Sequence, residues 1–148
     1  MDALTNPRTG QPITVESLTE AGREALPGFL GLEFTAIGDE RVQARLDVKP
    51  HHLAPNGYLH AATVIALADT ACGYGALAFR AEGATGFTTI EIKSNFLGTT
   101  REGAIAVTAT KAHGGRTTQV WDAEVVDERT GKPIALFRCT QMMLYPRE

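Results

Sequence analysis

The 148-residue sequence has little cysteine, no excess of positive charge and no apolar leader at its N-terminus. Its two cysteines, Cys72 and Cys139, lie in separate apolar segments without a CxxC pattern, so they predict buried thiols rather than a disulfide or zinc framework. With 14 basic against 17 acidic residues the net charge is −3, which excludes a global basic field for nucleic acid. The first 16 residues show no charged-then-apolar signal pattern, so a cytoplasmic setting is expected.

The apolar run over residues 61–79 is long enough to suggest a membrane span, which needs about 20 residues. However, Asp69 would lie at the bilayer centre, and alanine, glycine and threonine dilute the hydrophobicity of the run. We therefore expect a buried core helix and no membrane partner.

The apolar pattern changes period along the chain and predicts one domain with a substantial core. Residues 1–12 are loose, and a capping box of Thr14 and Ser17 begins a short helix that reaches about Leu26. Alternation on both sides of "GDE" predicts a hairpin over 32–48, a loop follows, and a long helix runs to about Arg80. Four further alternating segments predict strands at 87–97, 104–113, 116–127 and 134–145.

This order of elements predicts an α+β fold in which one long antiparallel sheet wraps one long central helix. An N-terminal extension with a short helix occupies residues 1–27, and the main domain occupies 28–148.

Asp69 is the one charge in the long helix and a candidate acid or base. A buried carboxylate must pair, stay hydrated or raise its pKa, and such groups often mark functional sites. The alternative is a structural carboxylate bonded to a loop. Its helix face is predicted to carry small residues suited to close approach by a backbone or ligand, while larger residues opposite face the sheet. The small-residue face comprises Ala62, Ile65, Ala66, Cys72, Gly73 and Ala76, and the opposite side Val64, Leu67, Tyr74 and Leu77.

The segments "GYLHAATVIALADTACGYGAL" and "TTIEIKSNFLGTTREG" resemble the hotdog-fold acyl-CoA thioesterases of the phenylacetate-degradation (PaaI-like) branch. His60 and Asp69 match the family spacing of a histidine and an acid nine residues later, and Gly57 matches the glycine before the histidine. The resemblance covers about residues 28–145. The family Gly-Gly is Ala61-Ala62 here, and the family asparagine falls at Ala54.

The resemblance implies hydrolysis of acyl-CoA with small aryl or short-to-medium acyl groups, without a metal or other cofactor. Asp69 is then general base or nucleophile, and the backbone N–H of Ala61 at the helix start is the oxyanion donor. Eight residues separate these two groups, about 12 Å of helical rise, so one helix cannot easily bring both to one carbonyl. Two antiparallel helices of a homodimer can, which matches the family; a dimer of dimers is common there.

Further residues have two interpretations each. His52 or Asn56 replaces the family asparagine in steadying the carbonyl or water. Thr89 holds that water or is an ordinary strand residue, and His60 shapes the turn or acts as a base.

The adjacent His51 and His52 lack a third metal ligand, so no metal site is predicted there. Gly57 belongs to the binding region, and the turn at 113–119 contacts the CoA phosphates or is a plain hairpin; its candidate residues are Gly115, Arg116 and Thr117.

Two other functions remain open. A hotdog dehydratase of 3-hydroxyacyl thioesters would also pair a histidine with an acid, but its Phe-Pro-Gly-rich approach is missing here. A non-catalytic acyl-CoA-binding module would keep the phosphate site yet would not need Asp69.

Overall fold

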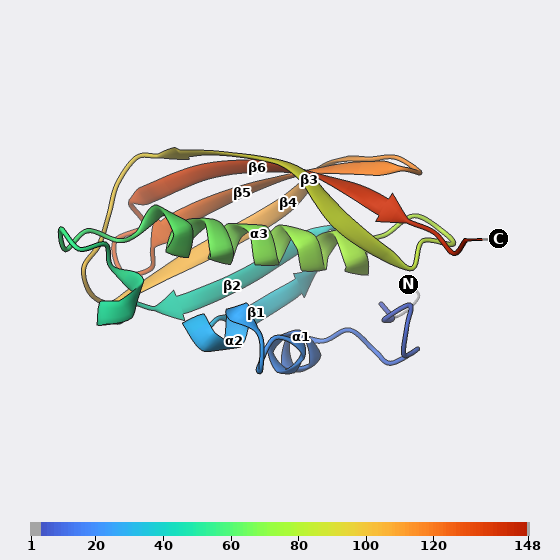
Figure 1. Ribbon diagram of the computed structural model, residues 1–148, viewed down its shortest axis with the longest axis horizontal. Coiled ribbons are helices and arrows are strands. Elements are labelled where there is room, and N and C mark those ends of the chain that lie inside the picture. Colours follow the sequence, from blue (N-terminus) through green and yellow to red (C-terminus); the bar gives the residue numbers. More distant parts are fainter. Residues whose placement is uncertain (1–3, 148) are drawn as a thin grey trace.

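A computed structural model describes residues 4–147, in which a curved sheet wraps around one long helix (Figure 1). The helices are α1 (Val15–Ala21), α2 (Leu26–Leu30) and α3 (Ala61–Ala78), with a 3₁₀ turn η1 at Pro50–His52. The strands are β1 (Glu33–Gly38), β2 (Arg41–Asp47), β3 (Gly86–Phe96), β4 (Ala104–Gly114), β5 (Thr118–Asp127) and β6 (Pro133–Leu144).

All neighbouring strands are antiparallel, in the order β1-β2-β4-β5-β6-β3. This confirms the predicted α+β class, the long central helix and the four C-terminal strands. Helix α3 is long and apolar enough to cross a membrane, but 56% of it is buried inside the protein, as a core helix is. Strand β3 lies at one edge of the sheet and β1 at the other.

The β1-β2 hairpin turns at the sequence "GDE", as predicted. Asp39 and Glu40 both adopt positive φ, 51° and 55°, which is the backbone of a type I′ turn. This turn type suits the right-handed twist of two adjacent strands, so the short polar stretch fixes the hairpin register.

The N-terminal segment has two short helices where the sequence predicts one ending near Leu26. The capping box is present, since Thr14 and Ser17 each accept from the other's backbone N–H, but α1 ends at Ala21. The sequence "LPGFL", predicted to end the helix, forms α2 instead, because proline is tolerated in a first helical turn.

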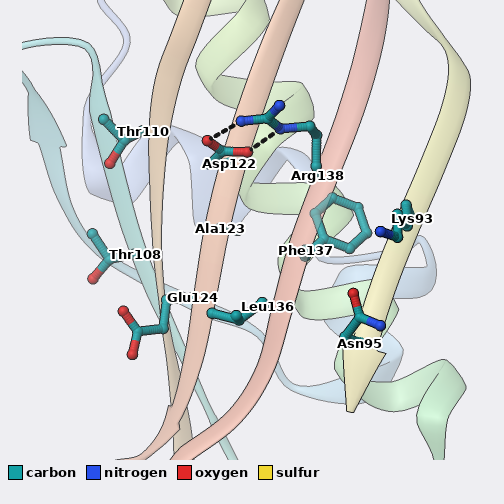
Figure 2. Close-up of a pocket in the computed structure, with 10 residues that line it drawn as sticks. All are labelled: Lys93, Asn95, Thr108, Thr110, Asp122, Ala123, Glu124, Leu136, Phe137 and Arg138. Carbon is teal, nitrogen blue, oxygen red and sulfur yellow. Dashed lines mark hydrogen bonds and ion pairs between the residues drawn. The ribbon is translucent and has the colours of Figure 1, made fainter. Parts of the chain in front are cut away.

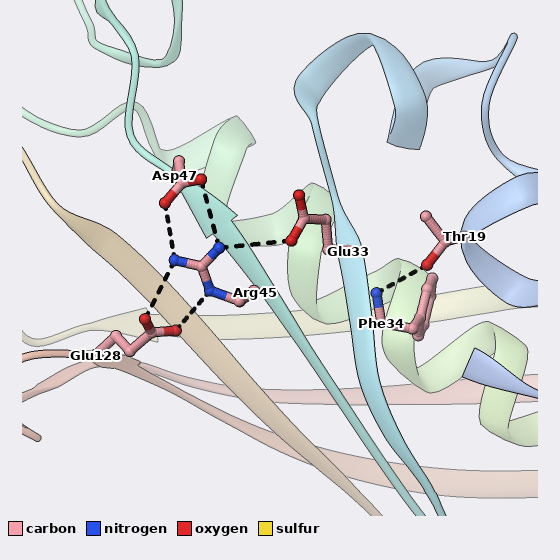
Figure 3. A network of polar contacts seen from close by, with 6 residues as sticks. All are labelled: Thr19, Glu33, Phe34, Arg45, Asp47 and Glu128. Carbon is pink, nitrogen blue, oxygen red and sulfur yellow. Dashed lines mark hydrogen bonds and ion pairs between the residues drawn. The ribbon is translucent and has the colours of Figure 1, made fainter. Parts of the chain in front are cut away.

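Polar contacts attach α1 to edge strand β1 and the β5-β6 turn to the neighbouring strand β2 (Figure 3). The Phe34 N–H on edge strand β1 donates to Thr19 Oγ1 at 3.1 Å, so α1 occupies part of that edge. Arg45 of β2 lies 2.8 Å from both Asp47 and Glu128 and 3.5 Å from Glu33. Its hydrogen bonds with Glu128 and Asp47 raise the pKa of the guanidinium above its usual range.

The small residues of α3 mainly pack against side chains of the sheet. The prediction of which helix face meets the sheet was therefore wrong. Cys72, Gly73 and Ala76, expected around Asp69, are buried, while Tyr74 and Leu77, expected against the sheet, are only half-buried. The sheet curves around the helix and so reaches more than one of its sides (Figure 1). A Cβ at Gly73 would lie 2.8 Å from the ring of Phe87 on β3.

Gly75 of α3 lies directly against Trp121 of β5, and we expect Gly75→Ala to destabilise the protein. The new Cβ would lie 2.5 Å from Cη2 of Trp121, which is fully buried and held by a 2.7 Å hydrogen bond to Gln119. Overpacking of about 1–3 kcal/mol or more outweighs a gain of about 1 kcal/mol in helix propensity. Chemical denaturation measures the loss in the free energy of unfolding. This loss should be smaller when Gly75→Ala is made in a Trp121→Leu background. Equal losses in both backgrounds would contradict the clash.

Candidate active site

Asp69 lies midway along α3 on the side facing edge strand β3. It is half-buried, and its Oδ1 is 3.4 Å from the Thr89 hydroxyl. Burial raises the pKa of Asp69 above its ordinary value, and the contact with Thr89 lowers it in part. The carboxyl group is therefore more basic than an exposed aspartate, which suits proton transfer. The structure thus brings together Asp69 and Thr89, two of the residues predicted from the sequence.

The N-terminus of α3 offers a free backbone donor. His60 is the N-cap: its Nδ1 accepts from the Ala62 N–H at 2.9 Å, and its carbonyl accepts from Thr63 at 3.0 Å. Within residues 4–147 the exposed Ala61 N–H has no acceptor, so it is available to an anionic oxygen at the positive end of the helix. His60 therefore caps the start of α3.

The loop before α3 is held by its own side chains. Asn56 is exposed, and its Oδ1 accepts from the Tyr58 N–H at 3.2 Å. Gly57 has a φ of 85°, a conformation that favours glycine. Asn56 therefore stabilises the turn that leads into the helix.

His52 is a buried structural residue, which corrects the expectation that it can steady a substrate. It is 1% exposed, its Nδ1 accepts from the Lys49 N–H at 2.9 Å, and its Nε2 contacts the Leu30 carbonyl at 2.8 Å. Burial lowers the pKa of His52, which favours the neutral ring. Neither ring nitrogen is left for a ligand.

The residues predicted to contact phosphate lie at the β4-β5 turn, on the surface of the protein. Arg116 and Thr117 are exposed, and the Gly115 N–H closes the turn by donating to the Thr118 carbonyl at 2.8 Å. The Arg116 guanidinium lies 5.4 Å from the centre of the Tyr145 ring, and the Tyr145 hydroxyl donates to the Arg116 carbonyl. The turn therefore presents one cation next to an aromatic ring.

Gln141 was not predicted as a site residue, yet it lies directly behind Thr89. It pairs with Thr89 across β6 and β3, is fully buried, and its Oε1 accepts from the Thr89 hydroxyl at 2.9 Å. A signal existed: in "IALFRCTQMMLY" the alternation places Gln141 on the apolar side of the strand. A buried amide there requires a hydrogen-bonding partner.

A hollow of about 560 Å³ lies on the outer face of the sheet, away from α3 (Figure 2). The Arg138 guanidinium spans it to Asp122, with N–O distances of 2.6 and 2.8 Å. None of the predicted site residues lines it. Within residues 4–147 no three His, Cys, Asp or Glu side chains gather into a group that could hold a metal ion.

Comparison with known proteins gives a consistent family. Residues 56–134 match the thioesterase superfamily. The 1,4-dihydroxy-2-naphthoyl-CoA hydrolase of Escherichia coli is 32% identical over 120 residues, which cover 79% of this chain and 85% of that protein. The enzyme of that name from Listeria monocytogenes is also 32% identical, over 75% of this chain and 89% of that protein.

Two solved structures that resemble this chain are also thioesterases. A thioesterase from Haemophilus influenzae has a TM-score of 0.86 and 26% identity, covering 98% of this chain and 97% of that one. A variant thioesterase from Pseudomonas aeruginosa has a TM-score of 0.83 and 28% identity, covering 90% of this chain and 96% of that one. The chain therefore belongs to the thioesterase superfamily and is a thioester hydrolase with the hotdog fold.

Proposed function

We propose that the protein hydrolyses acyl-CoA thioesters with small aryl or short-to-medium acyl groups, with Asp69 as the general base. The observation that carries the proposal is the environment of Asp69. Its carboxyl group is half-buried, has a raised pKa and lies beside the exposed Thr89 of edge strand β3. A carboxylate in this setting accepts a proton from water more readily than an exposed one.

The proposed site is shared by two copies of the chain. In one copy the Ala61 N–H and Asp69 are about 12 Å apart along α3, too far to act on one carbonyl. Edge strand β3 supports a dimer, because one side of its eleven-residue backbone is unpaired within the sheet and it exposes large apolar side chains. Ile90, Ile92 and Phe96 are 56%, 43% and 45% exposed. A twofold axis there would let each α3 complete the other's site.

The reaction then needs only the chain's own groups. Asp69 takes a proton from water while the water oxygen bonds to the carbonyl carbon, and the Ala61 N–H of the partner subunit stabilises the negative carbonyl oxygen. Thr89 is proposed to hold the same water. When the carbon–sulfur bond breaks, Asp69 returns the proton to the sulfur, which gives the free acid and CoA.

The CoA end is proposed to lie at the β4-β5 turn, where Gly115, Arg116 and Thr117 offer backbone, guanidinium and hydroxyl donors for phosphate. An aryl acyl group is supported by the two relatives, which are named as hydrolases of 1,4-dihydroxy-2-naphthoyl-CoA. The resemblance to the PaaI-like branch adds phenylacetyl-CoA as a candidate.

A thiol-release assay over benzoyl-, phenylacetyl-, hexanoyl- and palmitoyl-CoA tests the proposal. We expect turnover of the aryl and hexanoyl substrates, and weak or no turnover of palmitoyl-CoA. Binding of all four without thiol release would contradict hydrolysis and favour an acyl-CoA-binding module. Loss of water from a 3-hydroxyacyl-CoA, with the thioester intact, would instead favour a dehydratase.

A further inference from the structure

Gln141 is a polar side chain within the apolar interface between α3 and the sheet. It is fully buried, its Nε2 donates to Cys139 Sγ at 3.3 Å, and its Oε1 accepts from Thr89 Oγ1 at 2.9 Å. An apolar residue would fill this position without the cost of burying an amide. The one contact that Gln141 makes toward the candidate site is with the Thr89 hydroxyl.

The Thr89 hydroxyl has one hydrogen and two acceptors within reach. The Gln141 carbonyl oxygen is 2.9 Å away, whereas the Asp69 carboxylate oxygen is 3.4 Å away. A hydrogen bond weakens as it lengthens, so we assign the single Thr89 hydrogen to the nearer oxygen, that of Gln141. The oxygen lone pairs of Thr89 are then left toward Asp69.

We propose that Gln141 is a positioning residue that fixes Thr89 as a hydrogen-bond acceptor toward the attacking water. This rests on the proposed function of Asp69. A water that bridges the oxygens of Thr89 and Asp69 from one side gives one hydrogen to each oxygen, and its own lone pairs then face away from both, toward the thioester carbon. Asp69 removes the hydrogen that it receives, and Thr89 keeps the water in that orientation.

The same arrangement keeps Asp69 basic. A hydroxyl that donated fully to the carboxylate would lower the pKa of Asp69 more than the present 3.4 Å contact does, and would weaken Asp69 as a base. The other titratable groups that feel the charge of Asp69 are two buried thiols, Cys72 on α3 and Cys139 on β6. Because its amide is uncharged, Gln141 can direct the Thr89 hydrogen without adding a competing charge.

The test replaces Gln141 with methionine, which is apolar and of similar length. The pKa of Asp69 is followed by NMR with ¹³C-labelled aspartate, and kcat/KM by thiol release against pH. In Gln141→Met the freed Thr89 hydrogen goes to Asp69, so its titration and the acid limb of kcat/KM both move to lower pH. Turnover at neutral pH falls roughly tenfold, the size of effect that one hydrogen bond to a charged group can have.

The matched control repeats the substitution in a Thr89→Val background. There Gln141→Met should no longer move the Asp69 titration, because no hydroxyl remains to redirect. An unchanged Asp69 titration in the single variant, or a shift that persists without Thr89, would overturn the inference. The NMR titration does not depend on turnover, so this failure is distinct from failure of the proposed hydrolysis.

Discussion

Asp69→Asn is expected to abolish acyl-CoA hydrolysis while leaving the protein folded. Asparagine has the same shape as aspartate and keeps a polar group beside Thr89, so the local packing is kept. It cannot take a proton from water, and loss of a general base costs about 10²–10⁴ in rate. Thiol release by the purified variant at a saturating acyl-CoA concentration measures this loss.

Glu91→Gln is the matched control, because it makes the same change of charge on an exposed acid of the same edge strand. It should hydrolyse acyl-CoA at close to the unmodified rate. Substantial turnover by Asp69→Asn, or an equal loss in Glu91→Gln, would remove Asp69 from the role of base.

The raised pKa of Asp69 also fixes the sign of two pH effects. The carboxylate is the active form, so kcat/KM should fall as pH drops through a midpoint above the ordinary aspartate value of about 3.9. The folded protein binds this proton more readily than the unfolded chain, so the stability contribution of Asp69 is fully present at low pH and lost as pH rises through the native pKa. The Asp69→Asn variant should therefore be more stable than the unmodified protein at neutral pH. This difference in the free energy of unfolding should vanish at pH values below the pKa of Asp69 in the unfolded chain.

The sequence predicts the fold well, because its apolar period changes plainly between strands and helix. The order of strands across the sheet cannot be seen in any local stretch of sequence. Strand β3 pairs with β6, and the paired residues Thr89 and Gln141 are 52 residues apart in the chain. The helix faces were predicted incorrectly because periodicity does not show that Trp121 and Phe87 approach Gly75 and Gly73 from different parts of a curved sheet. The alternation of β6 places Gln141 on the buried face, but it does not show that the partner of Gln141 is Thr89 on another strand.

Ala61→Pro tests the other half of the proposed site with little disturbance to the helix. Ala61 is the first helical residue, where proline is favoured because its backbone N–H has no helical acceptor. The preceding His60 has φ −68° and ψ 133°, the extended conformation that a residue before proline adopts. The variant therefore loses one N–H, and we expect kcat to fall about 10²–10³-fold, as for the loss of one oxyanion donor.

Mixing Ala61→Pro with Asp69→Asn then decides whether the site is shared between subunits. After unfolding and refolding an equal mixture, about half of the dimers are mixed, and each mixed dimer has one site with both groups intact, so activity should recover to about a quarter of that of the unmodified protein. If Ala61 and Asp69 of one chain acted together, no mixed dimer would contain an intact site. The mixture would then be as inactive as its components, which would contradict the shared site while leaving the role of Asp69 to its own variant.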